Sequence, residues 1–181
     1  MKTLKTYIIE ASILNDIDDT LVDGDVKAPH SLIQKYLEDN YLGNWTISEK
    51  PNKDGLYEVS SNENINVENT NIISLTNNFF IWTNVKGYFN CSSCKKLKSL
   101  KGAPKAVGGS FSCTGCKSLK TLEGASKKIE SHFDCSYCPS LKSLDGAPEI
   151  VGGNFYCSDC GKLFTKDEAK KVSKINGRIY C

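Results

Sequence analysis

This 181-residue chain contains nine cysteines, and eight of them form Cys-x-x-Cys pairs. The pairs start at Cys91, Cys113, Cys135 and Cys157, and the ninth cysteine is Cys181. Such pairs serve as zinc ligands, redox centres, disulfides or core residues, depending on the element that carries them. The elements around the pairs must therefore be identified before a chemistry is assigned.

The pairs recur every 22 residues, in segments such as "SFSCTGCKSLKTLEGASKKIES" that begin at 88, 110, 132 and 154. A fifth segment, "RIYC", begins two residues late at Arg178. A unit this short cannot bury its own apolar face, so the copies must stack into a solenoid. Phe111 and Cys113 alternate with polar residues, which predicts one short strand per rung with both side chains pointing inward. Leu119, Leu122 and the glycines that follow predict an irregular return arm.

The pattern F-x-C-x-x-C-x-x-L-x-x-L-x-G-A-P-x-x-V-G-G resembles the leucine-rich repeat over residues 85 to 181. Phe111 and Cys113 stand in the two strand leucine places, and Cys116 stands in the Asn/Cys place. More narrowly, the chain is similar to short leucine-rich-repeat proteins of bacteriophages and gut bacteria. The resemblance implies a binding scaffold without a cofactor. The further expectation of a phage product that binds a host protein rests on this resemblance alone.

The expected fold class is α+β, a leucine-rich-repeat-like solenoid with an N-terminal helical cap. Residues 1–44 are expected to form this cap, residues 45–86 a hairpin and degenerate rungs, and residues 87–181 the regular repeats. Apolar spacing from Leu4 to Leu21 predicts one helix of the cap, and Ser31 to Tyr41 predicts a second.

A short helix is expected to close the last rung. Thr165 and Glu168 form a capping-box pattern immediately before "AKKVS". Residues 87–181 therefore include a C-terminal helical cap.

The place of each thiol in the rung favours a core role. The first cysteine of a pair lies on the inward side of the strand, and the second lies at a bend, where it can satisfy backbone groups. Cys181 occupies the first-cysteine position of the last strand, although no second cysteine follows it. Val67 occupies the same position in an earlier rung. An odd number of cysteines in a chain with no signal-peptide pattern indicates a reducing cytoplasm, in a bacterial cell or a phage-infected host, rather than a disulfide framework.

A zinc-binding ribbon array is the main alternative for these thiols. Cys91, Cys94, Cys113 and Cys116 fit the spacing C-x₂-C-x₁₈-C-x₂-C, and neighbouring rungs lie only about 4.8 Å apart. Two pairs could thus converge on one ion. A thioredoxin-like redox site is disfavoured because no βαβ pattern follows any pair.

Two other combinations suggest catalysis, and neither leads us to expect an enzyme. "ILNDIDDTLVDGD" resembles the haloacid-dehalogenase motif, in which Asp16 would be the nucleophile, Asp18 the acid/base and Thr20 a phosphate ligand. That motif needs a doubly wound sheet, whereas repeats take up the rest of this chain. His132 and Asp134 lie near Cys135 in the sequence, but a strand directs Cys135 to the opposite face.

The outward strand residues are the candidate binding surface, because a repeat protein keeps its core uniform and varies its exposed face. The three tyrosines among them are candidate anchors for an unidentified partner protein. The outward positions are Tyr88, Asn90, Ser92, Ser110, Ser112, Thr114, His132, Asp134, Ser136, Asn154, Tyr156, Ser158, Arg178 and Tyr180.

The distribution of charge offers a second surface. Residues 1–86 carry 7 Lys and 13 Asp or Glu, whereas residues 87–181 carry 16 Lys or Arg and 8 Asp or Glu. Lysines recur one period apart and should stack into ridges that bind phosphates, so nucleic acid is an alternative partner. No apolar run is long enough for a membrane span, and no membrane partner is expected. The recurring lysines are Lys95 and Lys117, and Lys98, Lys120 and Lys142.

Overall fold

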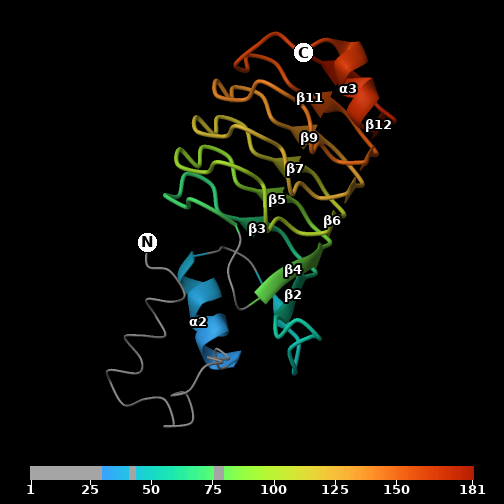
Figure 1. Ribbon diagram of the computed structural model, residues 1–181. Helices are drawn as coiled ribbons and strands as arrows, with labels where there is room; N and C mark the ends of the chain where they lie inside the picture. The colour runs from blue at the N-terminus through green and yellow to red at the C-terminus, as the bar shows by residue number, and fades with distance from the viewer. Residues whose placement is uncertain (1–29, 41–43, 76–79) are drawn as a thin grey trace.

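The chain forms a β-solenoid of about five turns in a computed structural model that describes residues 30–40, 44–75 and 80–181. Successive rungs stack along one axis, from the strands near residue 60 to the C-terminal end (Figure 1). The predicted solenoid is therefore confirmed. The helix expected from Leu4 to Leu21, and with it Asp16, Asp18 and Thr20, lies outside the described residues.

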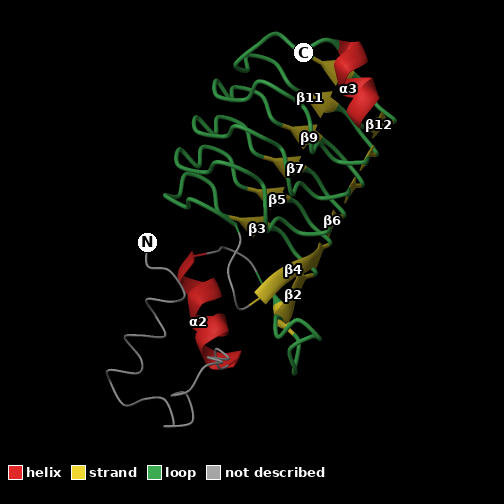
Figure 2. Ribbon diagram, in the orientation of Figure 1, coloured by secondary structure: helices red, strands yellow, loops and turns green. Residues whose placement is uncertain are grey.

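Each regular rung contributes two short strands, one to each of two sheets (Figure 2). The six-stranded sheet has the order β13-β11-β9-β7-β5-β3, and all of its strands pair in parallel. These strands are β3 (Ile65–Asn66), β5 (Phe89–Asn90), β7 (Phe111–Ser112), β9 (Phe133–Asp134), β11 (Phe155–Tyr156) and β13 (Ile179–Tyr180).

The seven-stranded sheet has the order β1-β2-β4-β6-β8-β10-β12 and is parallel except for the β1–β2 pair. The expectation of one strand per rung is thus wrong, because part of the predicted irregular arm is a second strand. The strands are β1 (Thr46–Ile47), β2 (Tyr57–Ser61), β4 (Phe80–Val85), β6 (Ala106–Val107), β8 (Lys128–Ile129), β10 (Ile150–Val151) and β12 (Lys174–Ile175).

The segment before the regular repeats also follows the sequence prediction. β1 and β2 form an antiparallel hairpin, with Thr46 opposite Ser60. β3 and β4 then join the two sheets as irregular early rungs. Val67 is buried in the place that later rungs give to a cysteine.

Two helices lie at opposite ends of the described solenoid (Figure 1). Helix α2 (His30–Asn40) begins one residue before the predicted start and buries Ile33 and Leu37. Helix α3 (Lys166–Val172) has the predicted capping box: the Glu168 N–H donates to the Thr165 side chain, and the Glu168 side chain accepts from the Thr165 N–H.

The core consists of columns of identical side chains, one from each rung. Phe89, Phe111, Phe133 and Phe155 stack with centroid separations of 5.3, 5.8 and 5.2 Å. Leucines of the arms and the second residue of β6, β8 and β10 close the interior on the other sides. Each column fixes one position of the rung, so outward residues are aligned just as regularly.

Candidate binding face and cysteine columns

The cysteines form two columns inside the solenoid. The first-cysteine column contains Cys91, Cys113, Cys135 and Cys157, and the second-cysteine column contains Cys94, Cys116, Cys138 and Cys160. All are buried except Cys160, which is half-buried. The inward direction predicted for Phe and Cys is confirmed.

The second-cysteine column satisfies backbone groups of the preceding rung, as its place at the bend suggested. The thiol of Cys116 donates to the carbonyl of Cys91 over 3.1 Å, and Cys138 donates to Cys113 over 3.3 Å. Cys94 makes the equivalent bond to Val67 over 3.1 Å. A thiol here therefore acts as a hydrogen-bond donor in a place where backbone carbonyls face the interior.

Burial disfavours the thiolate form of the buried column members. It raises the pKa of Cys91 and Cys113 well above the ordinary value, and it raises the pKa of Cys138 to about 12. Within the described ranges, no group of three or more His, Cys, Asp or Glu side chains is arranged to hold a metal ion. Cys91 and Cys113 are therefore neutral thiols that donate to backbone carbonyls. The hydrogen bond between Cys94 and Cys116 lowers the pKa of Cys94 to about 6 and raises the pKa of Cys116, so one proton is shared between these two side chains.

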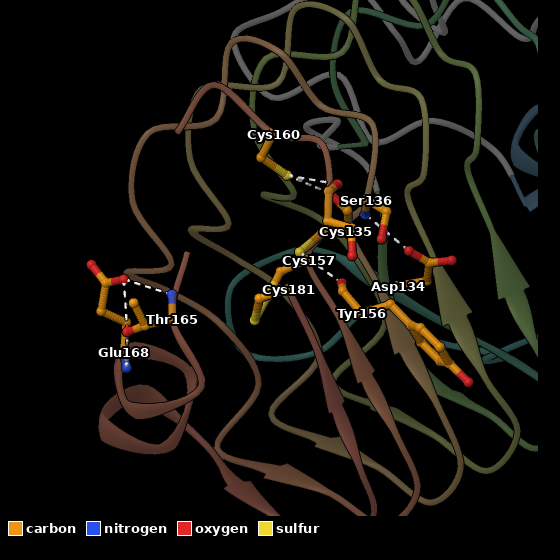
Figure 3. Close-up of a disulfide and its surroundings, with 10 residues drawn as sticks. Asp134, Cys135, Ser136, Tyr156, Cys157, Cys160, Thr165, Glu168 and Cys181 are labelled. Carbon is orange, nitrogen blue, oxygen red and sulfur yellow. Dashed lines mark hydrogen bonds between the residues drawn. A yellow bond between two sulfur atoms is a disulfide. The ribbon is translucent and has the colours of Figure 1, made fainter. Parts of the chain in front are cut away.

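One disulfide joins Cys157 to Cys181, and the other seven cysteines are free. It connects the last two rungs, 24 residues apart in the sequence, beside strands β11 and β13 (Figure 3). The sequence predicts no disulfide framework, and this single link arises because Cys181, at the end of the first-cysteine column, lies next to Cys157.

The outward residues of the six-stranded sheet form one aligned ladder. Asn90, Ser112, Asp134, Tyr156 and Tyr180 occupy the same register position in successive rungs. Figure 3 shows the side chains of Asp134 and Tyr156 on the side of the strands opposite to the cysteine sulfurs. The outward side chains of neighbouring rungs therefore lie side by side along this sheet.

Two predicted members of that face are almost fully buried. Ser92 and Ser136 are each only 5% exposed. Both lie beyond the end of the strand, where the chain already turns, and their backbone N–H groups donate to Asn90 and Asp134 respectively. The turn folds these serines against the rung, which the strand alternation did not predict. Among the other twelve, Tyr88, His132, Arg178 and Tyr180 are exposed, and Asn90, Ser110, Ser112, Thr114, Asp134, Asn154, Tyr156 and Ser158 are partly buried.

The residue just before each strand has a structural role that sequence reasoning missed. The side chain of Asn64 accepts from the N–H of Tyr88 over 2.9 Å, and that of Asn154 accepts from the N–H of Arg178 over 2.9 Å. Between them, His132 Nδ1 accepts from the N–H of Asn154 over 2.8 Å. The chain thus bonds each rung to the next through side chains as well as through strands. Asn154 follows the Gly-Gly pair at 152 and 153, which was the available signal, whereas no glycine precedes Asn64 or His132 directly.

Aromatic side chains gather at the C-terminal part of the face. The rings of Tyr156 and Tyr180 are parallel within 7°, with centroids 4.8 Å apart. His132 meets Tyr156 edge to face at 6.2 Å, and the Asn154 amide donates to the Tyr156 hydroxyl over 2.9 Å. We call His132, Tyr156 and Tyr180 the aromatic cluster.

A shallow hollow of about 490 Å³ lies at the N-terminal part of the same face. Five predicted residues line it: Tyr88, Asn90, Ser92, Ser110 and Ser112. Ser92 and Ser112 share a hydrogen bond of 2.7 Å on its floor. The face therefore offers a shallow hollow and, next to it along the solenoid axis, an aromatic cluster.

The predicted catalytic neighbours are separated as expected. Cys135 is buried in its column, whereas His132 is exposed and Asp134 lies on the outward face. Asp134 instead accepts a hydrogen bond from the N–H of Ser136 over 2.9 Å. These three side chains do not form a nucleophile and base pair.

Comparisons of the chain with protein-family models, curated proteins and solved structures find no match. In the described part of the chain, neither helix is long and apolar enough to pass through a membrane.

Proposed function

We propose that this protein is a non-enzymatic binding module that holds a partner protein on the outward face of the six-stranded sheet. The observation that carries the proposal is the aromatic cluster. Tyr180 is 40% exposed and Tyr156 stacks directly against it from the preceding rung, so the face presents rigid apolar area. Aromatic anchors of this kind dominate the energetics of protein interfaces.

Rigidity is the second support for the proposal. Tyr156 is fixed by Tyr180, by the His132 ring and by the Asn154 amide, so little rotamer entropy remains to be lost on binding. The neighbouring hollow provides hydroxyl and amide groups, which suit the polar surroundings of an anchor.

The setting is part of the same proposal. The similarity to leucine-rich-repeat proteins of bacteriophages rests on the repeat pattern of residues 85 to 181. On that basis, we place the partner among the proteins of a host bacterium and the complex in the cytoplasm.

Affinity capture from a bacterial lysate, followed by titration of the captured protein, tests the proposal. The double variant Tyr156→Ala/Tyr180→Ala should weaken binding of that protein at least tenfold, with little dependence on salt. Tyr137→Ala is the matched control, because Tyr137 is 62% exposed but lies on the turn beyond the strand. Equal affinity of the wild-type protein and the double variant would refute the sheet face as the binding site.

A further inference from the structure

A second, strongly basic surface lies on the arms that connect the two sheets. We define the lysine face as the outward side of residues 95–101, 117–123 and 139–145. These arms bury leucines such as Leu119 and Leu122 and expose the lysines between them. The N–H of Lys120 donates to the carbonyl of Lys98 over 3.0 Å, so the arms stack directly on one another. Its lysines are Lys95, Lys96, Lys98, Lys101, Lys117, Lys120 and Lys142.

The positive charge of this face is largely uncompensated. The seven lysines share the three arms with only two acidic residues, Glu123 and Asp145. Lys101 pairs with Glu123 over 2.9 Å, and none of the other six forms an ion pair with a described residue. By contrast, Lys127 and Lys128, on the seven-stranded sheet side, pair with Glu149 and Glu130.

The column Lys98, Lys120 and Lys142 places like charges one rung apart, about 4.8 Å along the axis at the backbone. Their mutual repulsion is relieved by any ligand that carries negative charges in a row. Ammonium groups bind phosphates as point charges without a fixed geometry. No aromatic side chain is exposed on these three arms, so bases have nothing to stack on.

We infer that the lysine face binds the phosphate backbone of a nucleic-acid duplex without sequence preference. This inference does not rest on the proposed function, because the lysine face and the aromatic cluster occupy different sides of the rung. Each contact releases counterions, so about four phosphate contacts give a slope of about −3.6 in log affinity against log salt. Affinity should then fall roughly 100-fold between 50 and 200 mM salt.

Fluorescence anisotropy with two labelled 20-base-pair DNA duplexes of unrelated sequence tests the inference. The full chain should bind both equally at 50 mM salt, and Lys98→Glu/Lys120→Glu/Lys142→Glu should weaken binding more than tenfold and reduce the slope by about 3. The matched control, Lys127→Glu/Lys128→Glu/Lys174→Glu, makes the same change in net charge on the other side and should retain most of the affinity.

Three results would overturn the inference. They are an absence of duplex binding by the wild-type chain at 50 mM salt, equal losses in both triple variants, and binding of poly-glutamate as tight as binding of the duplex. The last result would identify the ligand as an acidic protein. Tyr156→Ala/Tyr180→Ala should leave duplex binding unchanged, so failure here is distinguishable from failure of the sheet-face proposal.

Discussion

The thiol of Cys116 donates a hydrogen bond to the backbone carbonyl of Cys91, one rung earlier, over 3.1 Å. Cys116→Ala removes the donor and leaves this buried carbonyl without it, which should lower the free energy of unfolding by roughly 1 to 3 kcal/mol. Urea unfolding measures the change. Cys160→Ala is the control, because Cys160 makes the same bond over 3.2 Å but is half-buried, and water can replace it there. Equal losses in the two variants would contradict this account.

Cys113 tests whether the first-cysteine column is an apolar wall. Its thiol is fully buried and donates only a long hydrogen bond, of 3.5 Å, to the carbonyl of Asp134. Cys113→Ser buries a hydroxyl whose C–O bond is shorter than the C–S bond of cysteine. The variant should lower the free energy of unfolding by roughly 1 to 3 kcal/mol, measured by thermal or urea unfolding. Cys113→Val should cost less, since Val67 already fills this column in an earlier rung. A serine variant as stable as the valine variant would refute the apolar role.

The Cys157–Cys181 disulfide can be counted directly. A thiol titration of the protein denatured without reductant should find seven free thiols, and the same titration after reduction should find nine. Cys181→Ser should destabilise the oxidised protein by roughly 3 kcal/mol, because the disulfide closes a loop of about 24 residues. The reduced wild-type protein is the control, and it should be nearly as unstable as the variant. Nine thiols before reduction would exclude the disulfide.

Glu168 gives the C-terminal helix a defined response to acid. The hydrogen bond from Lys162, with that from the Thr165 N–H, lowers the pKa of Glu168 to about 2. A carboxyl with a lowered folded-state pKa stabilises the fold above its unfolded-state pKa, about 4.3, and this contribution is lost as the pH falls towards 2. Glu168→Gln keeps an acceptor for the capping box but cannot titrate. The unfolding midpoint of the variant should therefore fall less between pH 5 and pH 2.5 than that of the wild type, and parallel curves would contradict the assignment.

Gly124 tests how closely the rungs approach one another. Its φ is +85°, and a Cβ atom there would lie 2.6 Å from the backbone nitrogen of Lys101 in the preceding rung. Gly124→Ala should lower the free energy of unfolding by more than roughly 3 kcal/mol. It adds a clash with the backbone to the penalty that a residue with a side chain pays at positive φ. Gly55→Ala is the matched control, with φ at +77° and no atom within 4 Å of the added carbon, and it should cost roughly 1 to 2 kcal/mol. Unfolding free energies that differ by less than 1 kcal/mol would show that the rungs separate easily.

The period of the sequence predicted the features that repeat. Because every rung reuses the same places, the inward direction of Phe111 and Cys113, the bend at Cys116 and the valine substitute at Val67 all followed from alignment of the repeats. The hairpin and the capping box of α3 followed from local turn and helix signals.

The features that the sequence did not predict depend on contacts between rungs. β6 and β8 are only two residues long, with one buried side chain each. They are too short to show the alternation of polar and apolar residues that predicts a strand. The bond from the Asn154 N–H to His132 Nδ1 crosses 22 residues and exists only because the rungs stack so closely. The burial of Ser92 and Ser136 likewise results from a turn immediately after the strand.

The pairing of each strand with the same strand of the next rung also determines how the molecule would respond to a mechanical load. Rung-to-rung hydrogen bonds, such as that from the Phe133 N–H to the Asn154 carbonyl, run along the solenoid axis. A pull on Cys181 along that axis therefore stretches these bonds lengthwise and peels the array one rung at a time. The covalent link to Cys157 carries the force past the last rung, so extension starts between β9 and β11 and spares the stacked tyrosines.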